Sequence, residues 1–112
     1  MYSPAPHLSL VVPVYNGADR LPSSLDQLRA FLEAQPYESE LILVDDCSDA
    51  GARALLEEFA RATRRVRLIR NDENRGKGFA VTRGMRAAVG KYRVFTDADL
   101  AYPTTEVTKI LA

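Results

Sequence analysis

Four short apolar runs alternate with stretches of helical periodicity, and this order most restricts what the chain can fold into. The runs are rich in aliphatic and β-branched residues and end at proline or at polar clusters, as buried strands do. They cover residues 8–12, 40–44, 66–69 and 92–96. Strands separated by helices build a parallel sheet with right-handed crossovers. The sequence therefore predicts an α/β fold, with a mostly parallel sheet and flanking helices.

The stretches between the runs place apolar residues three to four positions apart, which is one face of a helix. The clearest example is Leu21, Leu25, Leu28 and Leu32. We expect Asp19 to cap this helix, because Asp is a favoured N-cap and Pro22 suits the first turn. We expect a turn at 49–51, a third helix over 79–89, and Gly90 to close that helix.

The 112 residues suit one domain, which we expect to span 1–112. No apolar run approaches the roughly 20 residues that cross a bilayer, and Met1–His7 lacks the pattern of a signal peptide. The single cysteine, Cys47, excludes an internal disulfide and fits a reducing, cytoplasmic setting. A further helix expected from Tyr102 still runs at Ala112, so we expect the chain to be part of a longer protein.

The charges are unevenly distributed, although the formal net charge is zero. Between Arg61 and Arg93, eleven Lys or Arg stand against two acids, a net of +9, and the remainder carries four bases and thirteen acids, a net of −9. This pattern predicts a basic surface beside an acidic one. Two solvated faces would explain it, and so would a surface that meets the phosphates of a nucleotide, a lipid head group or a membrane.

The fourth run ends in Asp97-Ala98-Asp99, which places two carboxylates one residue apart at a strand end. Their charges repel, and a divalent cation relieves that repulsion best. Mg²⁺ and Mn²⁺ take oxygen ligands and complete their shells with substrate phosphates. The segment therefore predicts a metal–diphosphate site.

Polar residues also follow the other three runs. Because the carboxyl ends of parallel strands meet at one edge of the sheet, we expect these segments to converge on one crevice. The Gly-rich basic segment at residues 74–78 would attract anions at a helix N-terminus, although it lacks the spacing of a Walker A loop. Taken singly, the adjacent acids Asp45 and Asp46 also suit a turn and helix cap, and the Gly-rich segment also suits a surface loop. The segments are Pro13-Val14-Tyr15-Asn16, Asp45-Asp46-Cys47-Ser48 and Asn74-Arg75-Gly76-Lys77-Gly78.

In order and spacing, the four segments resemble the family 2 inverting glycosyltransferases of the GT-A fold, and the resemblance covers residues 8–111. The Gly-Lys-Gly loop and residues 97–103 are most similar to the polyprenyl-phosphate branch, which moves glucose or mannose from a nucleotide sugar to dolichyl or undecaprenyl phosphate. The resemblance implies a Rossmann-like nucleotide-sugar-binding half, truncated after the fourth strand and part of the next helix. It implies a hexosyltransferase at the cytoplasmic face of a membrane, with UDP-glucose favoured over GDP-mannose.

The same resemblance implies roles at the base of the nucleotide. Pro13 and Tyr15 would line the base pocket, with Tyr15 against the nucleotide and Asn16 among the substrate-binding residues. Asp45 would hydrogen-bond the base, and Asp46 would support that corner.

On the phosphate side, the resemblance places Arg75 and Lys77 near the nucleotide and its phosphates. Asp97 would contact the ribose or the sugar, with Ala98 beside it among the substrate-binding residues. Asp99 would bind the Mg²⁺ or Mn²⁺ that bridges the diphosphate. Cations at this place would neutralise charge that develops on the leaving nucleoside diphosphate.

The chain departs from the family pattern at three places. Gly17-Ala18 stands where many relatives have an acidic residue, and Ala101 stands where a second metal ligand would fall. The general base and the acceptor site are expected beyond Ala112, so we expect the chain to bind donor and to be inactive alone.

Two other interpretations remain open. A nucleotidyltransferase of similar fold would also hold a metal and a nucleotide, although such enzymes carry a Gly-rich basic signature after the first strand that this chain lacks. A truncated or engineered α/β fragment would self-associate as a homodimer through an uncovered fourth strand and apolar faces. We expect no nucleic-acid partner.

Overall fold

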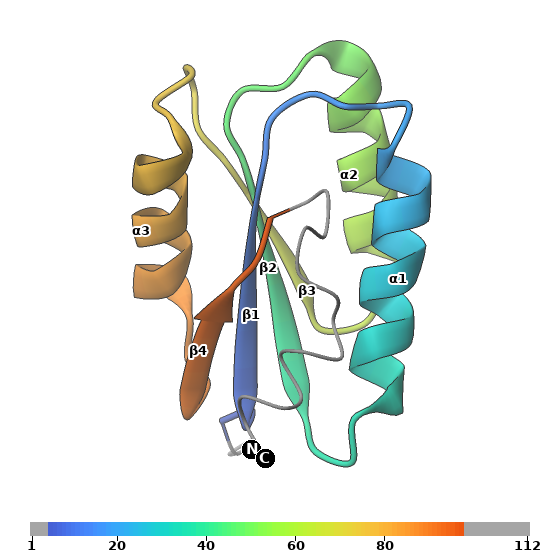
Figure 1. Ribbon diagram of the computed structural model, residues 1–112, viewed down its shortest axis with the longest axis vertical. Coiled ribbons are helices and arrows are strands. Elements are labelled where there is room, and N and C mark those ends of the chain that lie inside the picture. Colours follow the sequence, from blue (N-terminus) through green and yellow to red (C-terminus); the bar gives the residue numbers. More distant parts are fainter. Residues whose placement is uncertain (1–4, 98–112) are drawn as a thin grey trace.

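Four parallel strands form one sheet in the order β3-β2-β1-β4, in a computed structural model that describes residues 5–97 (Figure 1). The strands are β1 (Leu8–Val14), β2 (Ser39–Asp45), β3 (Val66–Arg70) and β4 (Tyr92–Phe95). The helices are α1 (Leu21–Ala34), α2 (Ala50–Ala62) and α3 (Lys77–Ala87). The predicted parallel sheet with flanking helices is confirmed. The helix expected from Tyr102 lies outside the described residues.

The sheet is covered on both faces, by α1 and α2 on one side and by α3 on the other (Figure 1). Side chains alternate between the two faces along a strand. In β2, Leu41 and Leu43 therefore pack with α1 and α2, while Ile42 and Val44 pack toward α3. This double burial explains why β2 is a continuous apolar run rather than an alternating one.

Strand β1 continues through Pro13 to Val14, whereas we expected Pro13 to end it. The carbonyl of Val14 accepts from Asp46 N on the β2 side, and the carbonyl of Val11 accepts from Thr96 N on the β4 side. Pro13 therefore presents its missing N–H toward β4, where the pairing ends at Val11 and Phe95. The proline costs no bond to β2, so only one of the two ladders stops before it.

The helix starts also differ from the expected ones. Asp19 does not cap α1. The N-cap of α1 is Arg20, whose side chain makes no capping hydrogen bond. The carbonyl of Gly17 accepts from Arg20 N and Leu21 N. The turn expected at 49–51 is instead the start of α2. Asp49 is the N-cap of this helix, and its Oδ1 accepts from Ala52 N at 3.0 Å. The capping chemistry of Asp was right in kind but assigned to the wrong helix.

Gly90 does not close α3, which ends at Ala87. The C-cap of this helix is Ala88, whose N–H donates to Gly84 O. Instead Gly90 lies against β1 and donates its N–H to Ser9 Oγ at 2.8 Å. A Cβ on Gly90 would come within 2.7 Å of Ser9 N. The glycine is therefore required by a close backbone approach, which sets β4 beside β1.

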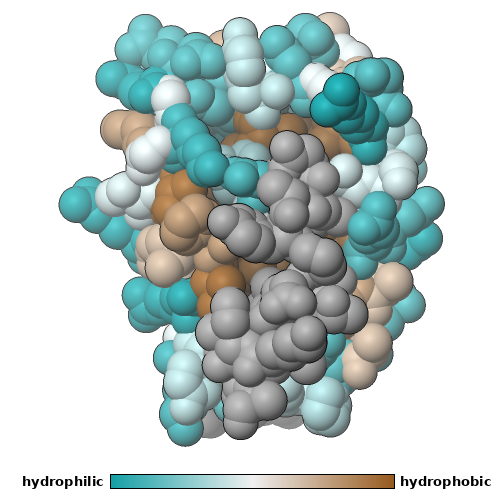
Figure 2. Space-filling view, viewed as in Figure 1, coloured by the Kyte–Doolittle hydropathy of each residue, from teal (hydrophilic) through white to brown (hydrophobic). Residues whose placement is uncertain are grey.

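Within residues 5–97, β4 pairs with β1 alone, and Tyr92 and Phe95 are about half exposed. Figure 2 shows apolar side chains near α3 and β4 among hydrophilic surroundings. Homodimer formation through this edge stays a prediction.

In the described part of the chain, no helix combines the length and the apolar character that a membrane span needs.

Candidate functional site

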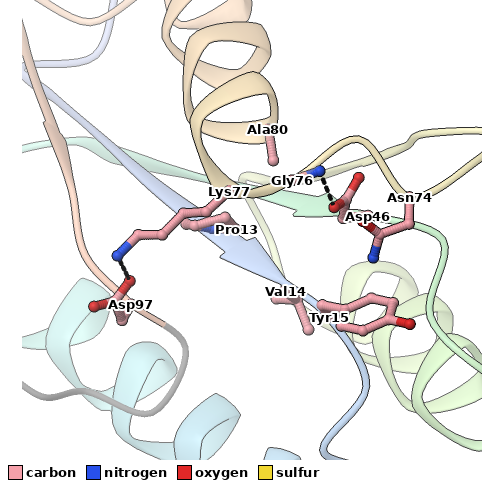
Figure 3. Close-up of a pocket in the computed structure, with 9 residues that line it drawn as sticks. All are labelled: Pro13, Val14, Tyr15, Asp46, Asn74, Gly76, Lys77, Ala80 and Asp97. Carbon is pink, nitrogen blue, oxygen red and sulfur yellow. Dashed lines mark hydrogen bonds and ion pairs between the residues drawn. The ribbon is translucent and has the colours of Figure 1, made fainter.

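A pocket of about 340 Å³ lies at the carboxyl end of the sheet, between the ends of β1 and β4 and the start of α3 (Figure 3). This is the place where the strand order reverses, since β1 leads to β2 on one side while β4 lies on the other. Such a switch point is where open α/β sheets bind ligands, and the volume is within the usual range for ligand pockets. The lining residues are Pro13, Val14, Tyr15, Asp46, Asn74, Gly76, Lys77, Ala80 and Asp97.

Asp46 holds the loop that leads into α3. Its Oδ1 accepts from Asn71 Nδ2 and from Arg75 N, both at 2.9 Å, and its Oδ2 accepts from Gly76 N at 2.8 Å. Gly76 has a φ of 93°, a conformation that favours glycine. One carboxylate at the end of β2 thus fixes the loop from which Lys77 emerges.

The pKa of Asp46 lies below its ordinary value of 3.8. Burial acts to raise this pKa, but the hydrogen bonds from Arg75 N, Asn71 and Gly76 N and the charge of Arg75 together outweigh burial. Asp46 is therefore an ionised anchor at neutral pH.

Acid should weaken the fold through this anchor. Because the folded pKa of Asp46 is depressed, its contribution is fully present above its unfolded pKa, near 4, and is lost as pH falls through the lower folded pKa. We expect urea unfolding to show a smaller loss of stability between pH 6 and pH 3 in Asp46→Asn than in wild type. An identical pH dependence in the two proteins would contradict this role.

Asp45 is 1% exposed and is not among the residues that line the pocket. Its Oδ2 accepts from Arg70 Nη1 at 2.5 Å and its Oδ1 from Ser48 N at 2.9 Å. The structure therefore does not bring Asp45 together with the pocket residues, and a contact from Asp45 to a base stays a prediction. The Asp45–Arg70 pair instead holds the start of the β2–α2 loop.

At the end of β1, Tyr15 lies in the pocket and Asn16 does not. Tyr15 lines the pocket and is 57% exposed. Asn16 lies outside the lining, in a left-handed conformation with φ 56°. Its Oδ1 accepts from Asp49 N and its N–H donates to Ser48 Oγ, both at 2.8 Å. Asn16 thus ties the β1–α1 loop to the start of α2.

The two basic residues of the Gly-rich loop also separate. Lys77 reaches into the pocket, where its ammonium pairs with Asp97 (Figure 3). The Arg75 guanidinium lies 3.0 Å from Glu73 Oε1 and stacks over the Phe79 ring, outside the pocket lining. Arg75 acts on the site through its backbone N–H, which donates to Asp46, and through its charge, which lowers the pKa of Asp46.

Few of the described groups could hold a metal ion. Within residues 5–97, no three His, Cys, Asp or Glu side chains come together. Both oxygens of Asp46 already accept N–H bonds, which leaves Asp97 as the pocket carboxylate that a cation could approach. Ala98 and Asp99 lie outside the described residues, so a metal at Asp99 stays a prediction.

Several residues of the site had no role assigned from the sequence. Val14, Asn74 and Gly76 belong to the segments expected to converge, and they line the pocket together with Ala80, which the sequence did not connect with the site. Asn71, 1% exposed, donates to Asp46 and accepts from Arg83 Nη1. Its position directly after an apolar run was the available signal, since a buried amide at a strand end must find hydrogen-bond partners.

Comparison with known proteins identifies the family of the chain. Residues 9–112 match the family described as glycosyl transferase family 2. Dolichyl-phosphate beta-glucosyltransferase of Drosophila melanogaster is 37% identical over 115 residues, which cover 96% of this chain and 35% of that protein. The chain thus spans about a third of the length of this relative.

Two solved structures share the fold. The mannosyltransferase PcManGT from Pyrobaculum calidifontis, in complex with GDP-Man and Mn²⁺, has a TM-score of 0.70 at 29% identity, covering 87% of this chain and 28% of that one. Staphylococcus aureus TarS 1-349 in complex with UDP has a TM-score of 0.66 at 25% identity, covering 82% and 27%. With a family match over residues 9–112 and a fold shared with these structures, the chain belongs to glycosyl transferase family 2.

Proposed function

We propose that this chain is the donor-binding part of an inverting glycosyltransferase that moves a hexose from a nucleotide sugar to a polyprenyl phosphate at the cytoplasmic face of a membrane. The acceptor class is supported by the similar dolichyl-phosphate beta-glucosyltransferase. We assign no catalytic base among residues 5–97, so the proposal for this chain itself is donor binding.

The observation that carries the proposal is the pocket at the strand switch point, which is aromatic at one end and charged at the other. Tyr15 offers an exposed ring for a flat base, while Lys77 and Asp97 lie at the opposite end (Figure 3). A nucleoside diphosphate has a matching arrangement, with a flat base that can stack on an aromatic ring and a negatively charged diphosphate tail. Asp46 would act by holding the loop between these ends.

Among donors, we propose UDP-glucose before GDP-mannose. One structural neighbour was solved with UDP and another with GDP-Man, so the fold itself accommodates either base. The preference for glucose rests on the similar beta-glucosyltransferase.

We further propose that Mg²⁺ or Mn²⁺ binds at Asp99, which follows the pocket carboxylate Asp97 by two positions in the sequence. The PcManGT complex with GDP-Man and Mn²⁺ supports metal use in this fold. When bound, the cation neutralises charge that develops on the leaving diphosphate.

Thermal unfolding with UDP, UDP-glucose and GDP-mannose, each with Mn²⁺, tests the proposal. At ten times its dissociation constant a donor should add about 1.4 kcal/mol of stability, which is roughly 5 °C in Tm for a domain of this size. We expect the largest shift with UDP-glucose. If none of the three shifts Tm at millimolar concentration, donor binding is wrong.

The same assay tests the metal ligand. In Asp99→Ala the shift should no longer depend on Mn²⁺, whereas the matched control Asp72→Ala, whose side chain is 91% exposed, should behave as wild type. A metal dependence that survives in Asp99→Ala would remove Asp99 from the site.

A further inference from the structure

Among the described residues that line the pocket there is one ion pair, between Lys77 at the first turn of α3 and Asp97 just beyond β4 (Figure 3). Their side chains are 56% and 32% exposed, so both groups are reachable from solvent. Among the described lining residues Lys77 is the only basic one, and the other acid, Asp46, is fully engaged by N–H donors of the loop. The cation best placed for a diphosphate is therefore neutralised by Asp97.

This pair is not needed to hold its two elements together. Helix α3 is fixed by Ala80 and Gly84, which are buried against β1 and β2, and a Cβ on Gly84 would come within 3.0 Å of Val44. Strand β4 is fixed by its ladder with β1. A partly exposed ion pair adds little stability, so a structural role explains the Lys77–Asp97 contact poorly.

We propose that Lys77 and Asp97 form an electrostatic latch that an incoming diphosphate opens. This inference rests on the proposed function. The diphosphate, with more negative charge than one carboxylate, draws the Lys77 ammonium from Asp97 to its own oxygens. The flexible stem of lysine permits the transfer without movement of α3. Asp97 is then free to accept hydrogen bonds from hydroxyl groups of the donor, so phosphate binding and hydroxyl binding become linked through one exchanged partner.

A double-mutant cycle with inorganic pyrophosphate tests the latch, with binding measured by calorimetry in EDTA at low ionic strength, where charge effects are least screened. Lys77→Met should weaken binding. Asp97→Asn should tighten it, by up to about fivefold, which is the upper range for a partly exposed ion pair. The tightening should disappear when Asp97→Asn is combined with Lys77→Met, because no cation is left to release.

Two further variants keep the result interpretable. Lys77→Arg retains the charge, so Asp97→Asn should still tighten binding in that background. Lys91→Met removes a lysine that contacts the Tyr92 ring outside the pocket, and pyrophosphate binding should stay near wild type. Circular dichroism melts would verify that every variant is folded.

Two outcomes overturn the latch and leave the proposed function standing. In one, Asp97→Asn tightens binding equally with and without Lys77, as simple removal of a negative charge would. In the other, the wild-type chain binds UDP but not pyrophosphate. Binding of neither UDP nor pyrophosphate, with or without Mn²⁺, would overturn the proposed function and the latch together.

Discussion

Asp46→Ala is expected to lower the free energy of unfolding by about 3 kcal/mol and to weaken UDP binding. The substitution removes the acceptor of three N–H donors, from Asn71, Arg75 and Gly76, around a residue that is 4% exposed. Leaving such groups unpaired costs about 1–3 kcal/mol each, less where water can reach them. Without the anchor, the loop that presents Lys77 loses its place. Urea unfolding and calorimetry with UDP measure the two effects.

Asp72→Ala is the matched control, because Asp72 lies in the same loop but its side chain is exposed and has a single described contact, at 4.0 Å from Arg75. Its stability should stay within about 0.5 kcal/mol of wild type, as is usual for surface substitutions. Equal effects of the two substitutions would mean that the carboxylate of Asp46 is not the anchor of the loop.

Gly90→Ala is expected to lower the free energy of unfolding by about 2–3 kcal/mol, which is typical of overpacking. A Cβ here would meet Ser9 Oγ at 2.5 Å, Ser9 N at 2.7 Å and the carbonyl carbon of Leu8 at 2.9 Å. Two of these atoms are backbone and cannot rotate away. The shift would also strain the neighbouring bond from Val89 N to the buried Glu40 carboxylate.

Gly78→Ala provides the opposite control, since nothing lies within 4 Å of a Cβ at this helical position. Alanine should stabilise α3 there by about 0.5–1 kcal/mol. If denaturant unfolding gave the two glycine variants the same stability, the close approach of Gly90 to β1 would not matter energetically.

Much of the fold could be predicted because its signals are local. Buried strands show as short apolar runs and helices as repeated leucines, and the alternation of the two implies a parallel sheet. The element boundaries were less accurate, because they depend on neighbours. Whether Pro13 ends β1 depends on which strand faces its missing N–H, and whether Gly90 caps a helix depends on how closely β1 passes.

The candidate site followed the same division. The sequence alone showed that polar segments follow every strand, and from the parallel sheet it followed that they share an edge. It could not say which side chain of each pair enters the pocket. Asp45 is the last residue of β2 and Asp46 follows it directly, and adjacent side chains of an extended chain leave on opposite sides. Both faces of β2 are apolar, so no pattern in the chain marks which face α3 covers.

The sequence by itself thus determined the order of strands and helices, the parallel sheet and the edge that carries the polar residues, because each is encoded by short-range periodicity. The tertiary structure alone decided that Asp46 anchors the loop while Asp45 pairs with Arg70, and that Lys77 enters the pocket while Arg75 turns toward Glu73. These choices depend on the packing of α3 against one face of the sheet, which brings together residues distant in the chain.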